Sequence, residues 1–137
     1  MLDLKPRLSE PDVLALLALS VYPDPARLEQ ARRSYLERDH WLLLGLEDGG
    51  RILGSIGLEL TGPGQATIRH IGVLEACRGR GIGRRLIEEA SIQLELDQLE
   101  AQTDEDAARF YQRCGFSVTS LGELHPGVER FRCVRST

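Results

Sequence analysis

The sequence predicts an α+β domain built around one mixed, mostly antiparallel central sheet that is flanked by helices. Two observations lead to this fold class. In the first half of the chain, strand-like apolar runs are separated by short glycine turns, which is the pattern of β-hairpins. In the second half, strand-like runs alternate with amphipathic helical segments, which is the pattern of βα crossovers. Hairpins give antiparallel neighbours and a crossover gives a parallel pair, so one sheet is expected to hold both.

Length and composition indicate a single domain that spans residues 1–137. A hydrophobic content of 42% and a charged content of 28% are ordinary for a globular protein. The net charge of −4 argues against a nucleic-acid partner, because proteins that bind nucleic acids are usually basic. The sequence has no apolar run of membrane-spanning length and no signal-peptide pattern, so we expect a cytoplasmic protein with no membrane partner.

The cysteines and histidines are scattered rather than paired. The sequence has no CxxC motif and no spacing typical of a metal site, so we expect reduced thiols and no bound metal. These residues are Cys77, Cys114, Cys133, His40, His70 and His125.

Two helices are expected before the first hairpin. Residues 2–8 fit a short strand that Pro6 interrupts. Ser9 is expected to cap a leucine- and alanine-rich helix that continues to Leu19. A second helix is predicted to start after Asp24, with its arginines on a solvated face.

A hairpin and a third strand follow these helices. The strands are predicted over residues 41–46, 51–60 and 65–73, with glycine-containing turns between them. Gly54 and Gly57 are unusual inside a strand and indicate a bulge or the close approach of another group. Alternation places these apolar residues of the second strand on one face: Ile52, Ile56, Leu58 and Leu60.

The second half of the chain is predicted to form a helix, a strand, a helix and two strands. Apolar residues recur at helical spacing from Ile82 onward, and a strand is expected over residues 98–103. Asp104 is placed to cap the next helix, which is expected to end at Gly115. The last two strands are predicted on either side of a loop, with boundaries at residues 116–120, 121–127 and 129–134.

The turn before the first of these helices is unusual. Four arginines surround the helix start, where the positive end of the helix dipole favours acidic residues. They are Arg78, Arg80, Arg84 and Arg85, with glycines at positions 79, 81 and 83. Cations beside an unhindered backbone at a helix N-terminus are typical of an anion site, and phosphate is the expected anion. The alternative is a glycine-rich turn with solvated arginines.

Two sequence blocks resemble the GNAT superfamily of N-acetyltransferases. Residues 78–83, Arg-Gly-Arg-Gly-Ile-Gly, match that family's (Gln/Arg)-x-x-Gly-x-(Gly/Ala) signature, and residues 71–73 fit the strand that enters it. Residues 103–116 resemble the family's (Ser/Thr)-(Asn/Asp)-x-x-Ala-x-x-Phe-Tyr-x-x-x-Gly-Phe run, and the whole resemblance covers about residues 54–118. A dinucleotide-binding Gly-x-Gly-x-x-Gly fingerprint fails, because Arg84 occupies its third glycine position.

The resemblance implies acetyl-CoA as co-substrate and a sheet whose central strands splay apart. The pantetheine arm would pair with the strand at Ile71 and Val73, and a main-chain N–H near Val73 would polarise the acetyl carbonyl. The pyrophosphate would lie on the N–H groups of residues 80–84. The implied coenzyme-binding residues are Ile71, Gly72, Val73, Arg78, Gly79, Arg80, Gly81, Ile82, Gly83, Arg84, Asp104, Ala107 and Phe110.

Candidate catalytic residues follow from the same comparison and from the chemistry of amine acetylation. Tyr111 matches the tyrosine that, in many family members, protonates the departing CoA thiolate; the alternative is a core aromatic. A general base must deprotonate the amine, and the choice is open among Glu59, His70 and Glu100. Alternation places His70 on the opposite face of its strand from the residues on either side of it.

The function expected from these residues is the direct transfer of an acetyl group from acetyl-CoA to a primary amine of a small molecule or peptide. Two alternatives stay open: a non-catalytic acyl-CoA-binding regulatory module, and a phosphate-binding module for a nucleotide. Glu123 and Glu129 favour a cationic acceptor. Cys77 stands where the family often has an aromatic residue, and it is either a filler or a reactive thiol. We expect a monomer or a homodimer, with the last strand as a pairing edge.

Overall fold

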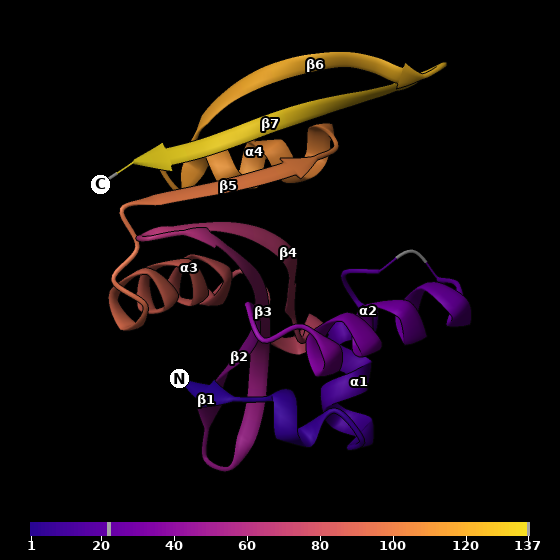
Figure 1. Ribbon diagram of the computed structural model, residues 1–137, viewed down its shortest axis with the longest axis vertical. Helices are drawn as coiled ribbons and strands as arrows, with labels where there is room; N and C mark the ends of the chain where they lie inside the picture. Colours follow the sequence, from indigo (N-terminus) through magenta and orange to yellow (C-terminus); the bar gives the residue numbers. More distant parts are fainter. Residues whose placement is uncertain (22, 137) are drawn as a thin grey trace.

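A seven-stranded sheet with helices on both faces forms the fold in the computed structural model, which describes residues 1–21 and 23–136 (Figure 1). The strand order is β1-β2-β3-β4-β5-β7-β6. Neighbouring strands are antiparallel except β4 and β5, which are parallel. This arrangement confirms the predicted α+β class with its mixed, mostly antiparallel sheet.

The predicted order of helices and strands is also confirmed, with small additions at the N-terminus and before α3. The strands are β1 (Leu2–Asp3), β2 (Trp41–Asp48), β3 (Arg51–Gly62), β4 (Gln65–Val73), β5 (Gln98–Thr103), β6 (Ser117–His125) and β7 (Val128–Ser136). The helices are α1 (Pro11–Ala18), α2 (Pro25–Glu37), α3 (Ile82–Gln93) and α4 (Glu105–Arg113). The additions are two short 3-10 turns, η1 (Lys5–Arg7) and η2 (Glu75–Cys77). The strand predicted over residues 2–8 is present only as β1, because η1 follows it.

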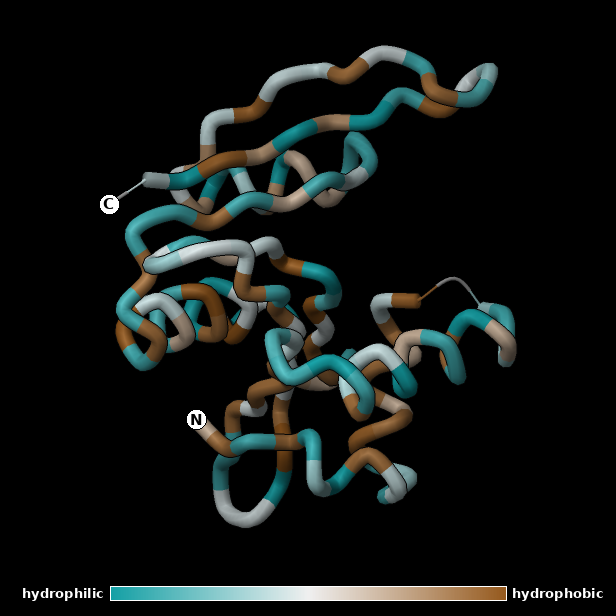
Figure 2. The backbone as a smooth tube through the Cα atoms, viewed as in Figure 1, coloured by the Kyte–Doolittle hydropathy of each residue, from teal (hydrophilic) through white to brown (hydrophobic). Residues whose placement is uncertain are grey.

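Two hydrophobic cores lie on opposite faces of the sheet. Leu43 packs with residues of α1 and α2, whereas its neighbour Leu44 packs with residues of α3 and α4. Because successive strand residues point to opposite faces, the two helix pairs cover different sides of the sheet. Hydrophobic residues run through the central strands, whereas α2 is largely hydrophilic away from the sheet (Figure 2).

The central strands β4 and β5 separate soon after they begin. Their pairing covers only Gln65–Thr67 against Gln98–Glu100. Beyond that point, β4 continues along β3 and β5 continues along β7, and β4 bends away from β5 (Figure 1). An extra residue in β4, Arg69, interrupts its register with β3 just past the last β4–β5 pair. This bulge increases the local bend, and the splay that the family resemblance implies is therefore present.

A second bulge, in β3, changes one predicted face. Leu46 pairs with Gly54 and Glu47 with Ile52, which leaves Leu53 as the extra residue. Past the bulge the alternation is inverted, so Ile52 packs in the core of α1 and α2, while Ile56 packs in the core of α3 and α4. The prediction that they share a face was wrong, but the bulge indicated by Gly54 is confirmed.

Two boundaries at the ends of the chain differ from the prediction. The N-cap of α1 is Glu10 rather than Ser9, with proline in the first turn and no side-chain cap, because η1 places Ser9 before the helix. The predicted loop after Ser120 is instead the second half of β6, which pairs with β7 as far as His125. Leu121 and Leu124 are extra residues in that pairing, so the strand lacks the alternation by which it would be recognised.

The close approach indicated by Gly57 is made by a buried tyrosine. A Cβ added at Gly57 would lie 2.6 Å from Cζ of Tyr35, which is fully buried. We expect Gly57→Ala to lower the free energy of unfolding by about 1–3 kcal/mol, because the added methyl overpacks this contact. Urea denaturation measures the change. Combined with Tyr35→Phe, the two losses should be less than additive, and simple additivity would contradict the contact.

Candidate functional site

The glycine turn, residues 78–83, needs glycine for two different reasons. Gly79 and Gly81 have φ values of 78° and 74°, in the left-handed region that other residues rarely adopt. Gly83 has an ordinary conformation, but a Cβ there would lie 2.9 Å from the ring of Phe110. The first two glycines therefore shape the turn, and the third lets α3 pack closely against α4.

The start of α3 leaves main-chain donors unpaired. Gly81 is the N-cap, with no side-chain cap and no acidic residue in the first turn. The first helical hydrogen bond runs from Arg85 N–H to Gly81 O, at 3.0 Å. The N–H groups of Ile82, Gly83 and Arg84 therefore have no acceptor among the described residues. Three donors at the positive end of a helix dipole suit an anion.

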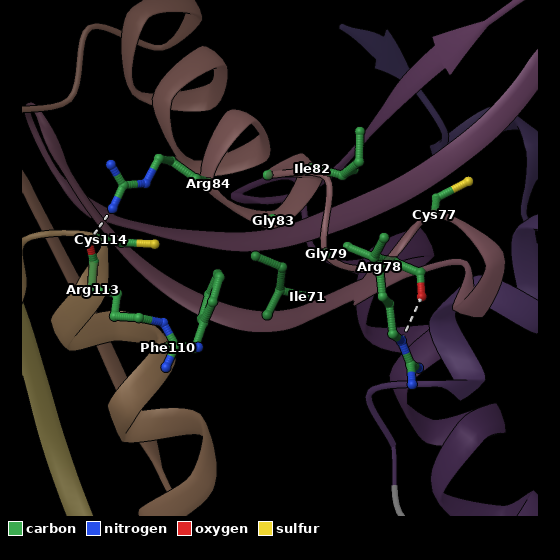
Figure 3. Close-up of a pocket in the computed structure, with 12 residues that line it drawn as sticks. Ile71, Cys77, Arg78, Gly79, Ile82, Gly83, Arg84, Phe110, Arg113 and Cys114 are labelled. Atoms are coloured by element: carbon green, nitrogen blue, oxygen red, sulfur yellow. Dashed lines mark hydrogen bonds between the residues drawn. The ribbon is translucent and has the colours of Figure 1, made fainter.

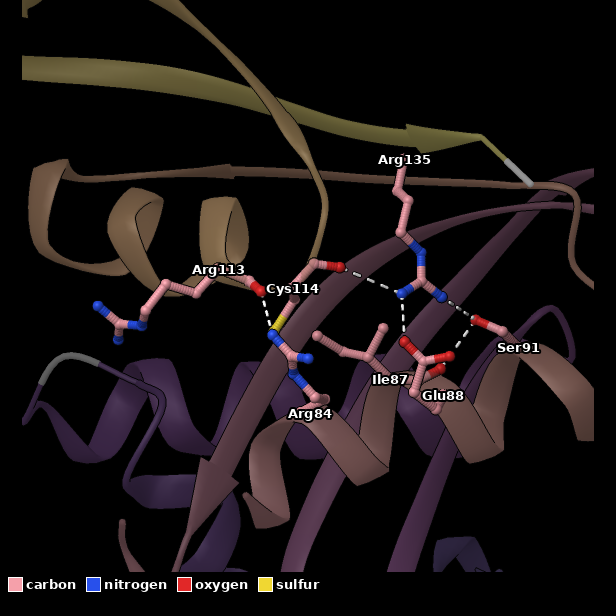
Figure 4. Close-up of polar contacts among 7 residues, drawn as sticks. All are labelled: Arg84, Ile87, Glu88, Ser91, Arg113, Cys114 and Arg135. Carbon is pink, nitrogen blue, oxygen red and sulfur yellow. Dashed lines mark hydrogen bonds and ion pairs between the residues drawn. The ribbon is translucent and has the colours of Figure 1, made fainter. Parts of the chain in front are cut away.

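The four arginines of this region do not converge on one point. Arg84 donates to the main-chain oxygen of Arg113 at the end of α4 (Figure 4), and Arg85 pairs with Glu89 at 3.2 Å. Arg78 Nε lies 3.4 Å from Val73 O (Figure 3). Arg80 is exposed and does not line the cavity that the turn borders. The expectation of four cations around an anion is thus reduced to Arg78 and Arg84.

A cavity of about 570 Å³, here named the turn cavity, lies between β4, the glycine turn, α3 and α4 (Figure 3). Nine of the predicted coenzyme residues line it: Ile71, Val73, Arg78, Gly79, Gly81, Ile82, Gly83, Arg84 and Phe110. Three further residues, which were not predicted to bind the coenzyme, also line it: Cys77, Arg113 and Cys114. The last two come from the C-terminal end of α4, the helix whose Phe110 packs against Gly83. None of the described residues that form its wall is a carboxylate.

Four predicted coenzyme residues lie outside the wall of this cavity. Arg80 is one, as described above. Gly72 faces α1, since a Cβ there would lie 3.0 Å from Leu16 O. Asp104 caps α4 by accepting a hydrogen bond from Ala107 N–H at 3.0 Å, as the sequence predicted for helix capping. Ala107 is the fourth. For Gly72, Asp104 and Ala107, the structure provides a packing or capping role.

The main chain of β4 faces the gap left by β5. Leu74 N–H donates to Leu53 O of β3 at 2.9 Å. Main-chain polar groups alternate sides along an extended strand, so those of Val73 and Ile71 point away from β3. They therefore face the gap, where an extended group could pair with them as another strand would.

Tyr111 lies in the core of α3 and α4, one residue from the cavity wall. Its side chain is buried, and its ring lies 5.2 Å from that of Phe110 and 5.1 Å from that of Phe116. No residue in the described part of the chain hydrogen-bonds its hydroxyl. Burial, with a smaller effect from Cys133 and Cys114, raises the pKa of Tyr111 above its usual value. The hydroxyl is thus protonated at neutral pH and can donate.

The three candidate bases all lie on the sheet face opposite the turn cavity. Glu100 is between core residues of β5, at the last β4–β5 pair, and its Oε1 lies 2.6 Å from Arg132 Nε. That hydrogen bond lowers the pKa of Glu100, so the carboxylate is charged at neutral pH. Glu59 accepts a hydrogen bond from Arg69, and its Oε2 lies 3.6 Å from His40 Nε2. Glu59 is thus held by two partners.

His70 is held by a buried tyrosine of α2. Its Nδ1 lies 2.5 Å from the hydroxyl of Tyr35. Burial, followed by the charge of Arg69, lowers the pKa of His70 to about 4. The prediction that His70 faces away from Arg69 was wrong: the bulge in β4 turns both side chains into one cavity, while Ile71 lines the other.

The depressed pKa of His70 makes stability depend on pH. The unfolded chain binds a proton near pH 6.5 and the folded chain only near pH 4, so stability is lost as pH falls between these values. Between pH 7 and pH 5 the loss should be about 2 kcal/mol. Urea denaturation of the wild type and of His70→Gln isolates this contribution, since carboxylate effects are common to both. Equal pH slopes would contradict the assignment.

The described residues place no three side chains of histidine, cysteine, aspartate or glutamate where they could hold a metal ion. Within the same residues, no helix is long and apolar enough to cross a membrane.

A family model and a curated relative both match this chain, and both are acetyltransferases. The family model described as an acetyltransferase (GNAT) domain matches residues 38–118. N-alpha-acetyltransferase RimI of Mycobacterium tuberculosis is 36% identical over 97 residues, which cover 63% of this chain and 58% of that protein. The chain thus spans less than two thirds of that relative's length.

Solved structures share the fold. A putative GNAT-family acetyltransferase from Desulfovibrio desulfuricans superposes with a TM-score of 0.77 at 17% identity, covering 91% of this chain and 90% of that one. An aminoglycoside 6'-N-acetyltransferase complexed with coenzyme A gives a TM-score of 0.75 at 14% identity, covering 91% and 88%.

Proposed function

This chain belongs to the GNAT acetyltransferase family, and on that premise we propose that it moves the acetyl group of acetyl-CoA directly to a primary amine of a small molecule or peptide. One observation carries the proposal. The main-chain N–H groups of Ile71 and Val73 face the β4–β5 gap, and both side chains line the cavity that reaches the N-terminus of α3. An elongated donor with an anionic end and an amide-bearing arm matches this shape and chemistry.

The residues of the turn cavity fit coenzyme A. The unpaired N–H groups of Ile82, Gly83 and Arg84 would hold the pyrophosphate, with Arg78 as an auxiliary cation. When bound, acetyl-CoA supplies the activated acetyl group as a thioester. The N–H of Val73, which faces the gap, would donate to the acetyl carbonyl and stabilise the negative charge that develops there. Among the residues that the structure describes, no carboxylate lines the cavity, so none repels the pyrophosphate.

Proton transfer would use two groups on different sides of the gap. Tyr111 would donate its proton to the departing thiolate, since its hydroxyl is protonated and otherwise unbonded among the described residues. Among the candidate bases, Glu100 is favoured because it lies where β4 and β5 part. It would accept the amine's proton through water. His70 is a weak base with Nδ1 already bonded. Glu59 and Glu100 are each bound by an arginine, so the position of Glu100 at the parting of β4 and β5, and not its ionisation, is what favours it.

A binding and turnover experiment tests the proposal. Calorimetry with acetyl-CoA should show binding, and a thiol-release assay over a panel of amines should show turnover. Failure to bind acetyl-CoA would overturn the proposal. Tight binding without turnover on any amine would favour the regulatory module, and a nucleotide that binds more tightly than coenzyme A would favour the nucleotide module.

A further inference from the structure

A second cavity, here named the Trp41 cavity, lies on the sheet face that α1 and α2 cover. It measures about 490 Å³. The side chains that matter for its chemistry come from α2, β2 and β4: Arg27, Gln30, Ser34, Trp41, Arg69 and His70. Arg69 also lines a smaller cavity that contains Glu100, so the Trp41 cavity adjoins the point where β4 and β5 part.

The charge around the Trp41 cavity is positive. Arg27 and Arg69 line it, and its wall contains no carboxylate among the described residues. Arg38 adds a third cation, because its guanidinium carbon lies 5.4 Å from the centre of the Trp41 ring. Glu59, which binds Arg69, and Glu100, which also interacts electrostatically with Arg69, oppose these cations, but neither lines the cavity. The wall itself therefore carries two arginines and, among the described residues, no carboxylate.

The neutral groups of the cavity also suit an anion. Gln30 and Ser34 in the wall carry groups that can donate hydrogen bonds, whereas Trp41 Nε1, which has no partner in the described part of the chain, is buried. His70 adds no negative charge, and its ring is fixed by Tyr35. A protonated amine would meet no anionic partner here, whereas a carboxylate would meet donors and cations.

We propose that the Trp41 cavity binds a carboxylate carried by the amine acceptor, so that the acceptor is an amino acid or a compound built like one. This inference rests on the proposed function. It reverses the expectation of a cationic acceptor, which depended on two glutamates of the β6–β7 hairpin. Glu123 bonds Gly127 N–H and Glu129 bonds the Ser120 hydroxyl, and neither lines the Trp41 cavity.

The single tryptophan of the chain gives a direct readout of this cavity. The full chain, saturated with coenzyme A, is titrated with matched probes while Trp41 fluorescence is recorded. The probes are glycine, β-alanine, leucine and glutamate, the α- or β-carboxamide of each, and spermidine. For at least one pair, we expect the carboxylate to bind about tenfold more tightly than the amide, as for a charge-assisted hydrogen bond.

Two substitutions of Arg27 in α2 test whether this residue causes the preference for carboxylate over amide. Arg27→Gln should lower the preference for carboxylate over amide about tenfold, and Arg27→Lys should retain part of it. Arg33→Gln is the matched control, because Arg33 is an exposed arginine of α2 that pairs with Glu37 and does not line the cavity. Its carboxylate preference should equal that of the wild type. Comparing ratios within each protein removes the intrinsic difference between an acid and its amide.

Several results would overturn the inference. Equal affinities for each acid and its amide would contradict it, as would tighter binding of spermidine than of any carboxylate. The same carboxylate-to-amide affinity ratio in Arg27→Gln and Arg33→Gln would also contradict it. So would the absence of any change in Trp41 fluorescence with every probe. Thiol release from acetyl-CoA is measured separately on the same amines. Turnover of amides or spermidine alone would contradict the carboxylate site while leaving acetyl transfer intact. Carboxylate binding without turnover would contradict acetyl transfer while leaving the site intact.

Discussion

Replacing Tyr111 with phenylalanine is expected to lower kcat by about 100- to 10,000-fold, the usual range for a lost general acid. Acetyl-CoA affinity should change little, because the hydroxyl acts on the leaving thiolate rather than on the bound coenzyme. The ring packs between Phe110 and Phe116, and phenylalanine preserves both contacts. Thiol release measures kcat, and calorimetry measures the affinity.

A packing control separates proton donation from support of α4. Phe116→Leu disturbs the same aromatic cluster without touching the hydroxyl, so it should lower stability more than Tyr111→Phe and kcat much less. If Tyr111→Phe turned over at the wild-type rate, Tyr111 would be a core aromatic, as its burial alone would suggest. If both variants lost kcat equally, the loss would come from packing.

Gly81→Val should weaken acetyl-CoA binding by at least about 100-fold. A β-branched residue at a φ of 74° is strongly disfavoured, so the turn must change shape. The three unpaired N–H groups at the start of α3 would then lose their common direction, and two or more charge-assisted hydrogen bonds would be weakened. Calorimetry with acetyl-CoA measures the loss.

Gly127→Val is the matched control for backbone strain. Gly127 has a φ of 78°, and a Cβ at either glycine would meet no atom within 4 Å. The two substitutions impose similar strain, but Gly127 lies in the turn of the β6–β7 hairpin, away from the turn cavity. Both variants should be less stable, and only Gly81→Val should lose acetyl-CoA. Equal loss of affinity would show that strain, not site geometry, is responsible.

Local sequence signals predicted the elements that build the turn cavity. The bounds of β4 and β5 agree with the prediction, and Asp104 caps α4 as expected. The signals that mark these elements are the alternation of apolar and polar residues in the strands, a capping side chain and glycines with positive φ. Each signal depends on residues that are close together in the sequence. The predicted anion site keeps its main-chain donors at the start of α3, but only two of the four arginines border the cavity.

Long-range packing explains the features of the site that could not be predicted from the sequence. Arg84 and Arg135 both bind main-chain oxygens at the end of α4, and Arg135 also binds Glu88 and Ser91 (Figure 4). Cations at a helix C-terminus are favourable, but no local pattern pairs residues so distant in the chain. The bulge at Arg69 has a similar effect, because one extra residue reverses which side chains share a face.

The most direct test of the coenzyme site is an amide NMR titration with acetyl-CoA. Binding should shift the amide signals of Ile71 and Val73 and of residues 82–84, and should slow their hydrogen exchange, because these N–H groups gain acceptors. Amides near Trp41 should change less. If acetyl-CoA did not bind, or if the shifts fell on the Trp41 cavity while residues 82–84 were unchanged, the proposed coenzyme site would be contradicted.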